Sequence, residues 1–174
     1  MTLYLVRHAT AEDRSRWTRN DRLRPLTRMG RYQAADVVDV LADLLTSTVD
    51  RGVDNKPAVL LSSPYVRCME TVFPLAARLE TIVQSTEALA EGSDTEAISL
   101  AQMYSDRIGD VVLCSHGDVI PMVLRYLSQQ HHVDLGEAPR CQKASVWMIE
   151  TTPTTGSTGP YGAARYLPPP GKGR

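Results

Sequence analysis

The chain has 174 residues, a size typical of one domain that buries a substantial core. Its 19 Lys and Arg residues nearly balance its 20 Asp and Glu residues, which disfavours a protein that binds nucleic acid through its phosphates. No window reaches the roughly 20 apolar residues that cross a membrane, and the first residues lack the pattern of a signal peptide. Three widely spaced cysteines do not suit a disulfide framework. We therefore expect a cytoplasmic protein whose partner is neither a nucleic acid nor a membrane.

The chain opens on an apolar run that is followed by a helical pattern. Residues 3–6 are apolar and lead directly into polar residues, which is typical of a buried strand in a parallel sheet. In residues 34–45 the apolar side chains recur at steps of three and four, which predicts a helix with one apolar face. Thr27 is a suitable N-cap for this helix.

The same alternation follows in the middle of the chain. Residues 58–61 predict a second strand. The second helix should begin at Ser63-Pro64, where the serine can act as a cap and the missing N–H of the proline costs nothing. Phe73 should face the core on this helix, and Pro74 should kink or shorten it.

The second half of the chain continues the pattern. The remaining predicted elements, in chain order, are a helix over residues 93–105, a strand over 111–114, a helix over 119–127, a strand over 145–150 and a hairpin partner over 163–167. Residues 151–160 are a Thr/Gly/Pro-rich linker, and residues 168–174 are expected to be a disordered tail after a domain that spans residues 1–167. Strands that alternate with helices imply an α/β domain, with a mostly parallel central sheet between two layers of helices.

Histidines and arginines follow three of the predicted strands. Arg7 and His8 follow the first strand, Arg67 comes shortly after the second, and His116 follows the third. We expect these side chains to converge, because ligands of such sheets gather outside the carboxyl ends of the strands. Guanidinium groups match phosphate oxygens in pairs and lower the pKa of a nearby histidine, which can then attack phosphorus in its neutral form. The sequence therefore predicts a site for phosphoryl transfer.

Four blocks in this sequence resemble, in order, the motifs of the histidine phosphatase superfamily. LVRHATA resembles its Arg-His motif, LTRMGRYQA its Leu-Thr-x-x-Gly-x-x-Gln-Ala helix start, LSSPYVRCMET its Ser-Ser-Pro block, and VVLCSHGDVI its strand that ends in His-Gly. The blocks cover the chain to about Glu150. The resemblance implies the three-layer α/β/α sandwich of the phosphoglycerate mutase-like fold. Position 9 holds alanine, where glycine is more usual in the superfamily. In this position the chain resembles the SixA-like branch of phosphohistidine phosphatases.

The resemblance also implies a mechanism. His8 would be the nucleophile that carries a covalent phosphohistidine intermediate, and Arg7, Arg67 and His116 would bind the phosphate. No metal or other cofactor is implied. The substrate would be a phosphohistidine protein, a small phosphate ester or a nucleotide, so the expected partner is a phosphorylated small molecule or a phosphoprotein.

Three acidic residues are candidates for the proton donor. Leu89-Ala90-Glu91 is similar to the Leu-x-Glu context of the family's acid, which favours Glu91. Glu87 is a neighbour that could serve instead, and Asp118 lies two positions after His116.

The N-terminal segment is basic, with eight arginines against three acidic residues in residues 1–31. Such a run is either a solvated face or a surface that steers phosphorylated substrates. Its form, RHATAEDRSRW followed by RPLT, resembles the SixA-like branch and the histidine phosphatase domains fused to Nudix hydrolases. That resemblance implies that Arg14, Asp21 and Arg24 line the mouth of the pocket.

Two other functions stay open: a phosphoglycerate mutase, and a noncatalytic module that binds a phosphorylated ligand. The short chain argues against the mutase, and the intact set of arginines and histidines argues against the module. Cysteine phosphatase chemistry is excluded, because no cysteine has an arginine six positions later. His131 and His132 do not predict a metal site, since adjacent side chains point apart.

Overall fold

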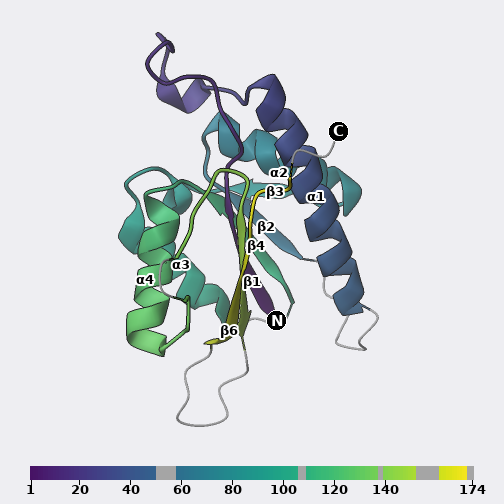
Figure 1. The fold of residues 1–174 in the computed structure, drawn as a ribbon, viewed down its shortest axis with the longest axis vertical. Helices are drawn as coiled ribbons and strands as arrows, with labels where there is room; N and C mark the ends of the chain where they lie inside the picture. Colours follow the sequence, from purple (N-terminus) through teal and green to yellow (C-terminus); the bar gives the residue numbers. More distant parts are fainter. Residues whose placement is uncertain (50–57, 106–108, 137–138, 152–160, 172–174) are drawn as a thin grey trace.

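A computed structural model describes residues 1–49, 58–105, 109–136, 139–151 and 161–171. In this part of the chain six strands form one sheet in the order β3-β2-β4-β1-β5-β6, with helices on both faces (Figure 1). The strands are β1 (Thr2–Arg7), β2 (Val59–Ser62), β3 (Val83–Ser85), β4 (Val111–Ser115), β5 (Val146–Thr151) and β6 (Tyr161–Leu167). The helices are α1 (Arg28–Val49), α2 (Val66–Arg78), α3 (Asp94–Ser105) and α4 (Val119–His131), with two short 3-10 turns, η1 (Asp21–Leu23) and η2 (Glu87–Leu89).

The sheet is mixed. The strands β3, β2, β4 and β1 pair in parallel, whereas β5 runs antiparallel to β1 and β6 runs antiparallel to β5. The prediction of a mostly parallel sheet is therefore confirmed for these four strands, and the predicted hairpin at the end of the chain is also confirmed. The strand β3 is not predicted from the sequence, because it has only three residues and two of them are exposed.

Helices cover both faces of the sheet, with α1 and α2 on one side and α3 and α4 on the other (Figure 1). Successive side chains of β1 point to opposite faces, as in any strand. Tyr4 and Val6 pack in a core with residues of α1 and α2, and Leu3 and Leu5 pack in a second core with residues of α3 and α4. The predicted three-layer α/β/α architecture is confirmed.

Helix α2 departs from its prediction at two points. It begins at Val66 and not at Ser63, because the Ser63 side chain bonds within the functional site and does not cap the helix. The prediction that Phe73 faces the core is wrong, since this ring is 52% exposed. Val72, the residue before it, is buried. Because each further residue of a helix is rotated by about 100°, Phe73 points away from the core. The helix continues past Pro74, which therefore does not end it.

The end of β6 at Leu167 coincides with the predicted end of the domain, and that boundary stays a prediction. Residues 152–160 of the linker and residues 172–174 of the tail lie outside the described residues. Within the described ranges, no helix is long and apolar enough to cross a membrane. The same ranges contain no group of three or more His, Cys, Asp or Glu side chains arranged to hold a metal ion.

Candidate active site

The residues predicted to bind phosphate come together at the carboxyl edge of the parallel strands. Arg7 and Ser115 are paired at the ends of β1 and β4, so His8 and His116 leave neighbouring strands at the same level. The centres of their rings lie 5.3 Å apart in an edge-to-face arrangement. Arg67, in the first turn of α2, donates to His116 Nδ1 at 3.4 Å. Pairing within the sheet thus assembles a site from distant parts of the chain.

His8 is held as a neutral ring with one free nitrogen. Its side chain is buried, and Nδ1 donates a hydrogen bond to the carbonyl oxygen of Ala9 at 2.8 Å, so the lone pair lies on Nε2. Burial lowers the pKa of His8 from 6.5 to about 3, and the charges of Arg67 and Arg7 act in the same direction. The bond to Ala9 opposes this shift without cancelling it. His8 is therefore ready to act as a nucleophile without first losing a proton.

Arg67 is fully buried and its guanidinium group has partners on both sides. Nη2 donates to Glu91 Oε1 at 2.5 Å, and Nη1 donates to the carbonyl oxygen of Asp21 at 3.0 Å and lies 3.1 Å from its carboxylate. The ring of Tyr65 lies 4.4 Å from the guanidinium carbon. A buried arginine requires such compensation, which also fixes the plane of the group.

His116 has a single tautomer that fits its neighbours. Its Nδ1 accepts from Arg67, so Nε2 carries the proton and donates to Ser63 Oγ at 2.8 Å. The ring is 1% exposed and also contacts the ring of Tyr65 edge to face. The Ser-Ser-Pro turn therefore serves the site by orienting this histidine.

Arg7 lies against a glycine that makes room for it. A Cβ atom at Gly117 would be 2.5 Å from the guanidinium carbon of Arg7, so only glycine allows this approach. Arg7 Nη1 donates to the carbonyl oxygen of Cys141, in the loop before β5. The glycine of the His-Gly motif thus positions the arginine of the Arg-His motif.

The Leu-Thr-x-x-Gly-x-x-Gln-Ala block fixes the loop after His8. Thr27 caps α1 as predicted, since its Oγ1 accepts from the amide of Gly30 at 2.9 Å, and it also donates to the carbonyl oxygen of Thr10 at 3.1 Å. The amide of Thr10 donates to Gln33 Oε1 at 3.0 Å. A Cβ at Gly30 would lie 1.9 Å from the Thr10 oxygen, so glycine is required for the start of α1 to approach this loop.

The Glu-Thr pair of α2 anchors two neighbouring segments. Glu70 accepts from the amide of Leu26 at 2.6 Å, and Thr71 Oγ1 accepts from the amide of Ala9 at 3.1 Å. Thr71 also donates to the carbonyl oxygen of Arg67 at 2.7 Å. Helix α2 therefore holds the loop after β1 and Arg67 in fixed relation to each other.

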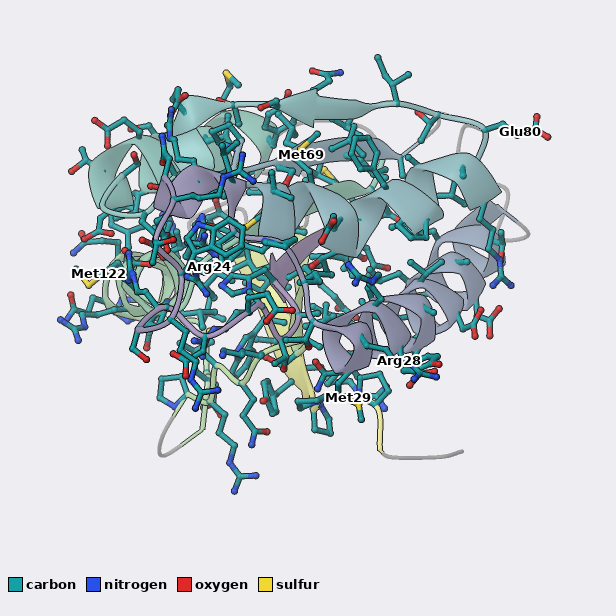
Figure 2. All side chains as sticks on the ribbon, turned by 90° about the horizontal axis from the view of Figure 1, so that it is seen from above. Arg24, Arg28, Met29, Met69, Glu80 and Met122 are labelled. Carbon is teal, nitrogen blue, oxygen red and sulfur yellow. The ribbon has the colours of Figure 1, made fainter. Side chains whose placement is uncertain are left out.

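The three residues predicted at the pocket mouth form one charged network. Asp21 accepts from Arg24 Nε at 2.7 Å and lies 3.4 Å from Arg14 Nη2. Partial burial opposes ionisation of Asp21, but the hydrogen bond from Arg24 and the charge of Arg67 lower its pKa. Arg24 is buried, whereas Glu80 projects from the periphery of the molecule (Figure 2). Asp21 thus orients the arginines that surround the site.

The three candidate proton donors occupy different places. Glu91 lines the cavity and bridges Arg67 and Arg14, with Oε2 accepting from Arg14 Nη2 at 2.8 Å. Asp118 also lines the cavity and accepts from the amide of Gly92 at 2.9 Å. Glu87 lies outside the cavity lining and pairs with Arg22 at the surface. The geometry favours Glu91 or Asp118 over Glu87.

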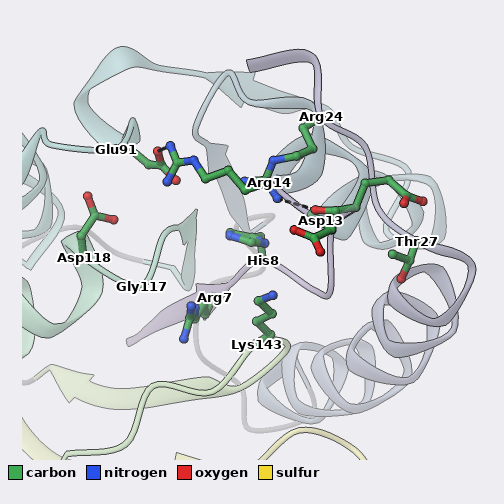
Figure 3. A pocket seen from close by; sticks show the side chains of 12 residues that line it. Arg7, His8, Asp13, Arg14, Arg24, Thr27, Glu91, Gly117, Asp118 and Lys143 are labelled. Carbon is green, nitrogen blue, oxygen red and sulfur yellow. Dashed lines mark hydrogen bonds and ion pairs between the residues drawn. The ribbon is translucent and has the colours of Figure 1, made fainter. Parts of the chain in front are cut away.

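A cavity of about 810 Å³ opens over His8 (Figure 3). Its lining residues come from β1, the loop after it, and the loops around η2, α4 and β5: Arg7, His8, Ala11, Glu12, Asp13, Arg14, Arg24, Thr27, Glu91, Gly117, Asp118 and Lys143. The cavity is larger than a phosphate group needs, so it has room for the rest of a substrate. Arg67 and His116 are buried and are not among the lining residues, and His116 lies next to His8.

Lys143, which precedes β5, is not predicted from the sequence. Its place depends on the antiparallel direction of β5, which brings the first residues of this strand to the same edge as the carboxyl ends of the parallel strands. The hydrogen bond between Ser63 and His116 is not predicted either, because it depends on where the fold places His116.

Comparisons with known proteins place these observations in a family. The family model of the histidine phosphatase superfamily (branch 1) matches residues 3–106. A curated relative from Mycolicibacterium smegmatis (strain ATCC 700084 / mc(2)155), named 8-oxo-(d)GTP phosphatase, is 31% identical over 173 residues, which are 97% of this chain and 48% of that protein. The chain thus spans about half the length of the curated relative that it matches.

Solved structures share the fold at low sequence identity. SixA from Agrobacterium tumefaciens has a TM-score of 0.69 and 19% identity, with 97% of this chain and 98% of that chain covered. The protein histidine phosphatase SixA complexed with tungstate has a TM-score of 0.64 and 19% identity, with 94% and 96% covered. The predicted phosphoglycerate mutase-like, SixA-like architecture is confirmed.

Proposed function

Since the chain belongs to the histidine phosphatase superfamily, we propose that it hydrolyses a phosphorylated substrate through a covalent intermediate on His8. One observation carries the proposal: His8 is neutral, presents a free Nε2 to a large cavity, and is surrounded by Arg7, Arg67 and His116. This arrangement supplies a nucleophile and the positive charge that phosphoryl transfer requires.

The reaction has two steps. In the first, His8 Nε2 attacks the phosphorus atom, a P–N bond forms, and the P–O bond to the leaving group breaks. In the second, water attacks the phosphorus, the P–N bond breaks, and phosphate is released. The bond from Nδ1 to Ala9 stabilises the ring when phosphorylation makes it cationic. Arg7 and Arg67 stabilise the charge on the equatorial oxygens in both steps.

Glu91 is the favoured proton donor for an ester substrate. It lines the cavity and accepts a hydrogen bond from the guanidinium group of Arg67. A phosphoryl group that binds Arg67 would compete with Glu91 for this guanidinium group. Substitution of Glu91 by Gln should slow an alkyl phosphate much more than p-nitrophenyl phosphate, whose leaving group needs little help. A selective loss in Asp118→Asn in place of Glu91→Gln would transfer the role to Asp118.

The size of the cavity and the curated relative favour a small molecule, and a nucleotide in particular. The relative that covers almost the whole chain is named for a nucleoside triphosphate derivative, and a cavity of about 810 Å³ accommodates a ligand of nucleotide size. A phosphohistidine protein is the second candidate, suggested by the shared fold of the SixA structures.

The first test is release of phosphate from p-nitrophenyl phosphate in EDTA by the wild type and His8→Ala. His132→Asn is a matched control, because His132 is an exposed histidine with φ of 56°, a conformation that asparagine tolerates. We expect turnover in the wild type and the control, none in His8→Ala, and an acid-labile phosphoryl group on His8. Equal turnover in His8→Ala would refute the mechanism. Tight phosphate binding without turnover would favour a binding module, and conversion of 3- to 2-phosphoglycerate would favour a mutase.

A further inference from the structure

The loop before β5 is held tightly against the nucleophile. The amide of Ala144 lies within hydrogen-bond distance of two carbonyl oxygens, those of Arg7 at 3.1 Å and His8 at 3.2 Å. The amide of Arg7 donates to the carbonyl oxygen of Ser145 at 3.0 Å, and its side chain donates to that of Cys141. This loop is therefore part of the wall of the site and is anchored to the end of β1.

Ala144 adopts a strained conformation within this loop. Its φ is 62°, in the left-handed region that residues with a Cβ atom rarely adopt, and the residue is fully buried. Such strain persists only where surrounding contacts enforce it, and it is common at functional sites. The consequence is that the residue before it, Lys143, has a fixed starting direction.

Lys143 extends from this loop into the cavity. Figure 3 shows its side chain pointing from the wall toward His8, on the side of Arg7 and Asp13. Burial lowers the pKa of Lys143, and the charges of Arg7, Arg24 and Arg67 lower it further, while Asp13 opposes them. The three arginines therefore outweigh Asp13 in their effect on the ammonium group.

Two of the four cations that line the cavity already have carboxylate partners. Arg14 and Arg24 form salt bridges with Asp21 or Glu91, whereas none of the salt bridges among the described residues involves Arg7 or Lys143. Arg7 is assigned to the transferred phosphoryl group. Lys143 remains as a cation without a carboxylate partner, placed among other cations. A ligand that brings a second negative group would compensate it.

We propose that Lys143 binds a second anionic group of the substrate, next to the phosphoryl group that His8 receives, and that the preferred substrates are therefore phosphoanhydrides such as nucleoside diphosphates. This inference rests on the proposed function and specifies its substrate. The group bonded to the transferred phosphoryl in a phosphoanhydride is itself a phosphate, which carries the required charge at the required position.

The chemistry of this step balances without an added proton. His8 Nε2 attacks the terminal phosphorus, the anhydride P–O bond breaks, and the shorter phosphate leaves as an anion with the electron pair of that bond. Lys143 stabilises the leaving phosphate as its charge develops. Water then cleaves the P–N bond of His8. Such a leaving group does not depend on Glu91, which is bound to Arg67 and Arg14 before substrate arrives.

The test compares two substrates in three variants. The measured quantity is kcat/KM for a nucleoside diphosphate divided by kcat/KM for p-nitrophenyl phosphate. Lys143→Met removes the charge at similar size, Lys143→Arg keeps a charge, and Arg125→Met is a control that removes an exposed cation of α4. Because a hydrogen bond to a charged group is lost, the ratio should fall about 10- to 100-fold in Lys143→Met. It should recover largely in Lys143→Arg and stay constant in Arg125→Met.

Three results would overturn this role. They are a wild type that does not prefer the diphosphate to the matching monophosphate, equal losses on both substrates in Lys143→Met, and an unchanged ratio in Lys143→Met. Thermal denaturation of each variant separates a loss of folding from a loss of binding. The proposed function fails separately, if p-nitrophenyl phosphate is not hydrolysed at all or is hydrolysed equally by His8→Ala.

Discussion

The contact between Gly117 and Arg7 allows a local test of the phosphate site. Gly117 does not have a positive φ, so alanine should fit its backbone without strain. The added Cβ atom, however, would lie 2.5 Å from Cζ, 2.6 Å from Nη2 and 2.8 Å from Nε of Arg7. Since the atoms that it meets belong to the end of a flexible side chain, the fold should tolerate Gly117→Ala while the guanidinium group moves.

The expected loss follows from the size of this movement. Ordinary contacts of a Cβ atom begin at 3.4 Å, so the guanidinium carbon of Arg7 must withdraw by about 0.9 Å, the difference between 3.4 and 2.5 Å. A misplacement of about 1 Å in a catalytic group can lower the rate on the order of 100-fold. This corresponds to about 2.7 kcal/mol of lost transition-state stabilisation. The bond from Arg7 to Cys141 should be disturbed at the same time.

The assay is kcat/KM with p-nitrophenyl phosphate, together with thermal denaturation. Gly162→Ala in β6 is the matched control, because its Cβ would make only ordinary contacts at 3.7 Å with Glu150. We expect a loss on the order of 100-fold in Gly117→Ala, little change in the control, and similar melting temperatures for both. If Gly117→Ala kept nearly full activity, Arg7 would not act on the phosphoryl group from this position.

Four further predictions test other parts of the site. Because the pKa of His8 is about 3, protonation of His8 should not lower kcat/KM between pH 7 and about pH 4 after correction for substrate ionisation. A decrease in the corrected kcat/KM with a midpoint near pH 6.5 would contradict this. Unfolded His8 takes up a proton near pH 6.5 and folded His8 does not, so this residue should make the free energy of unfolding decrease as the pH drops from 6.5 toward 3 in urea titrations. Ser63→Ala should lower kcat about 3- to 10-fold by removing the hydrogen-bond partner of His116, and Ser63→Thr should restore part of it; equal kcat in Ser63→Ala would exclude the orienting role. Gly30→Ala should lower the free energy of unfolding by about 1–3 kcal/mol, because its Cβ meets the backbone of Thr10, and an unchanged urea midpoint would show that this loop can move away.

The convergence of Arg7 and His8 with His116 could be predicted because it follows from the general geometry of parallel sheets. Apolar runs end at Arg7 and His116, and parallel pairing of β1 with β4 necessarily brings such ends together. The predicted Thr27 cap is also confirmed, since it depends only on residues three positions apart. The register of α2 was harder to predict, because Phe73 is apolar but lies beside the buried stripe of the helix.

The remaining features depend on how loops pack, which local patterns do not determine. Lys143 reaches the cavity because β5 is antiparallel, and the sequence shows a strand there without showing its direction. Glu87 and Glu91 are the same residue type and lie only four positions apart. Glu91 nevertheless bridges two arginines of the site, whereas Glu87 pairs with Arg22 at the surface. Only the conformation of the segment around η2 separates them.

Ion pairing reduces the charge that the basic N-terminal segment presents to a substrate. Its excess of arginines suggests a surface that attracts phosphorylated substrates, but four of the eight arginines, at positions 14, 22, 24 and 31, form salt bridges in the folded chain. A paired arginine adds little to a long-range field, and its main effect is to fix loops around the cavity. Within the cavity, Arg7 and Lys143 lack carboxylate partners among the described residues, so their charge is available to a substrate. A pocket of this kind should select ligands by the arrangement of their negative groups more than by their total charge.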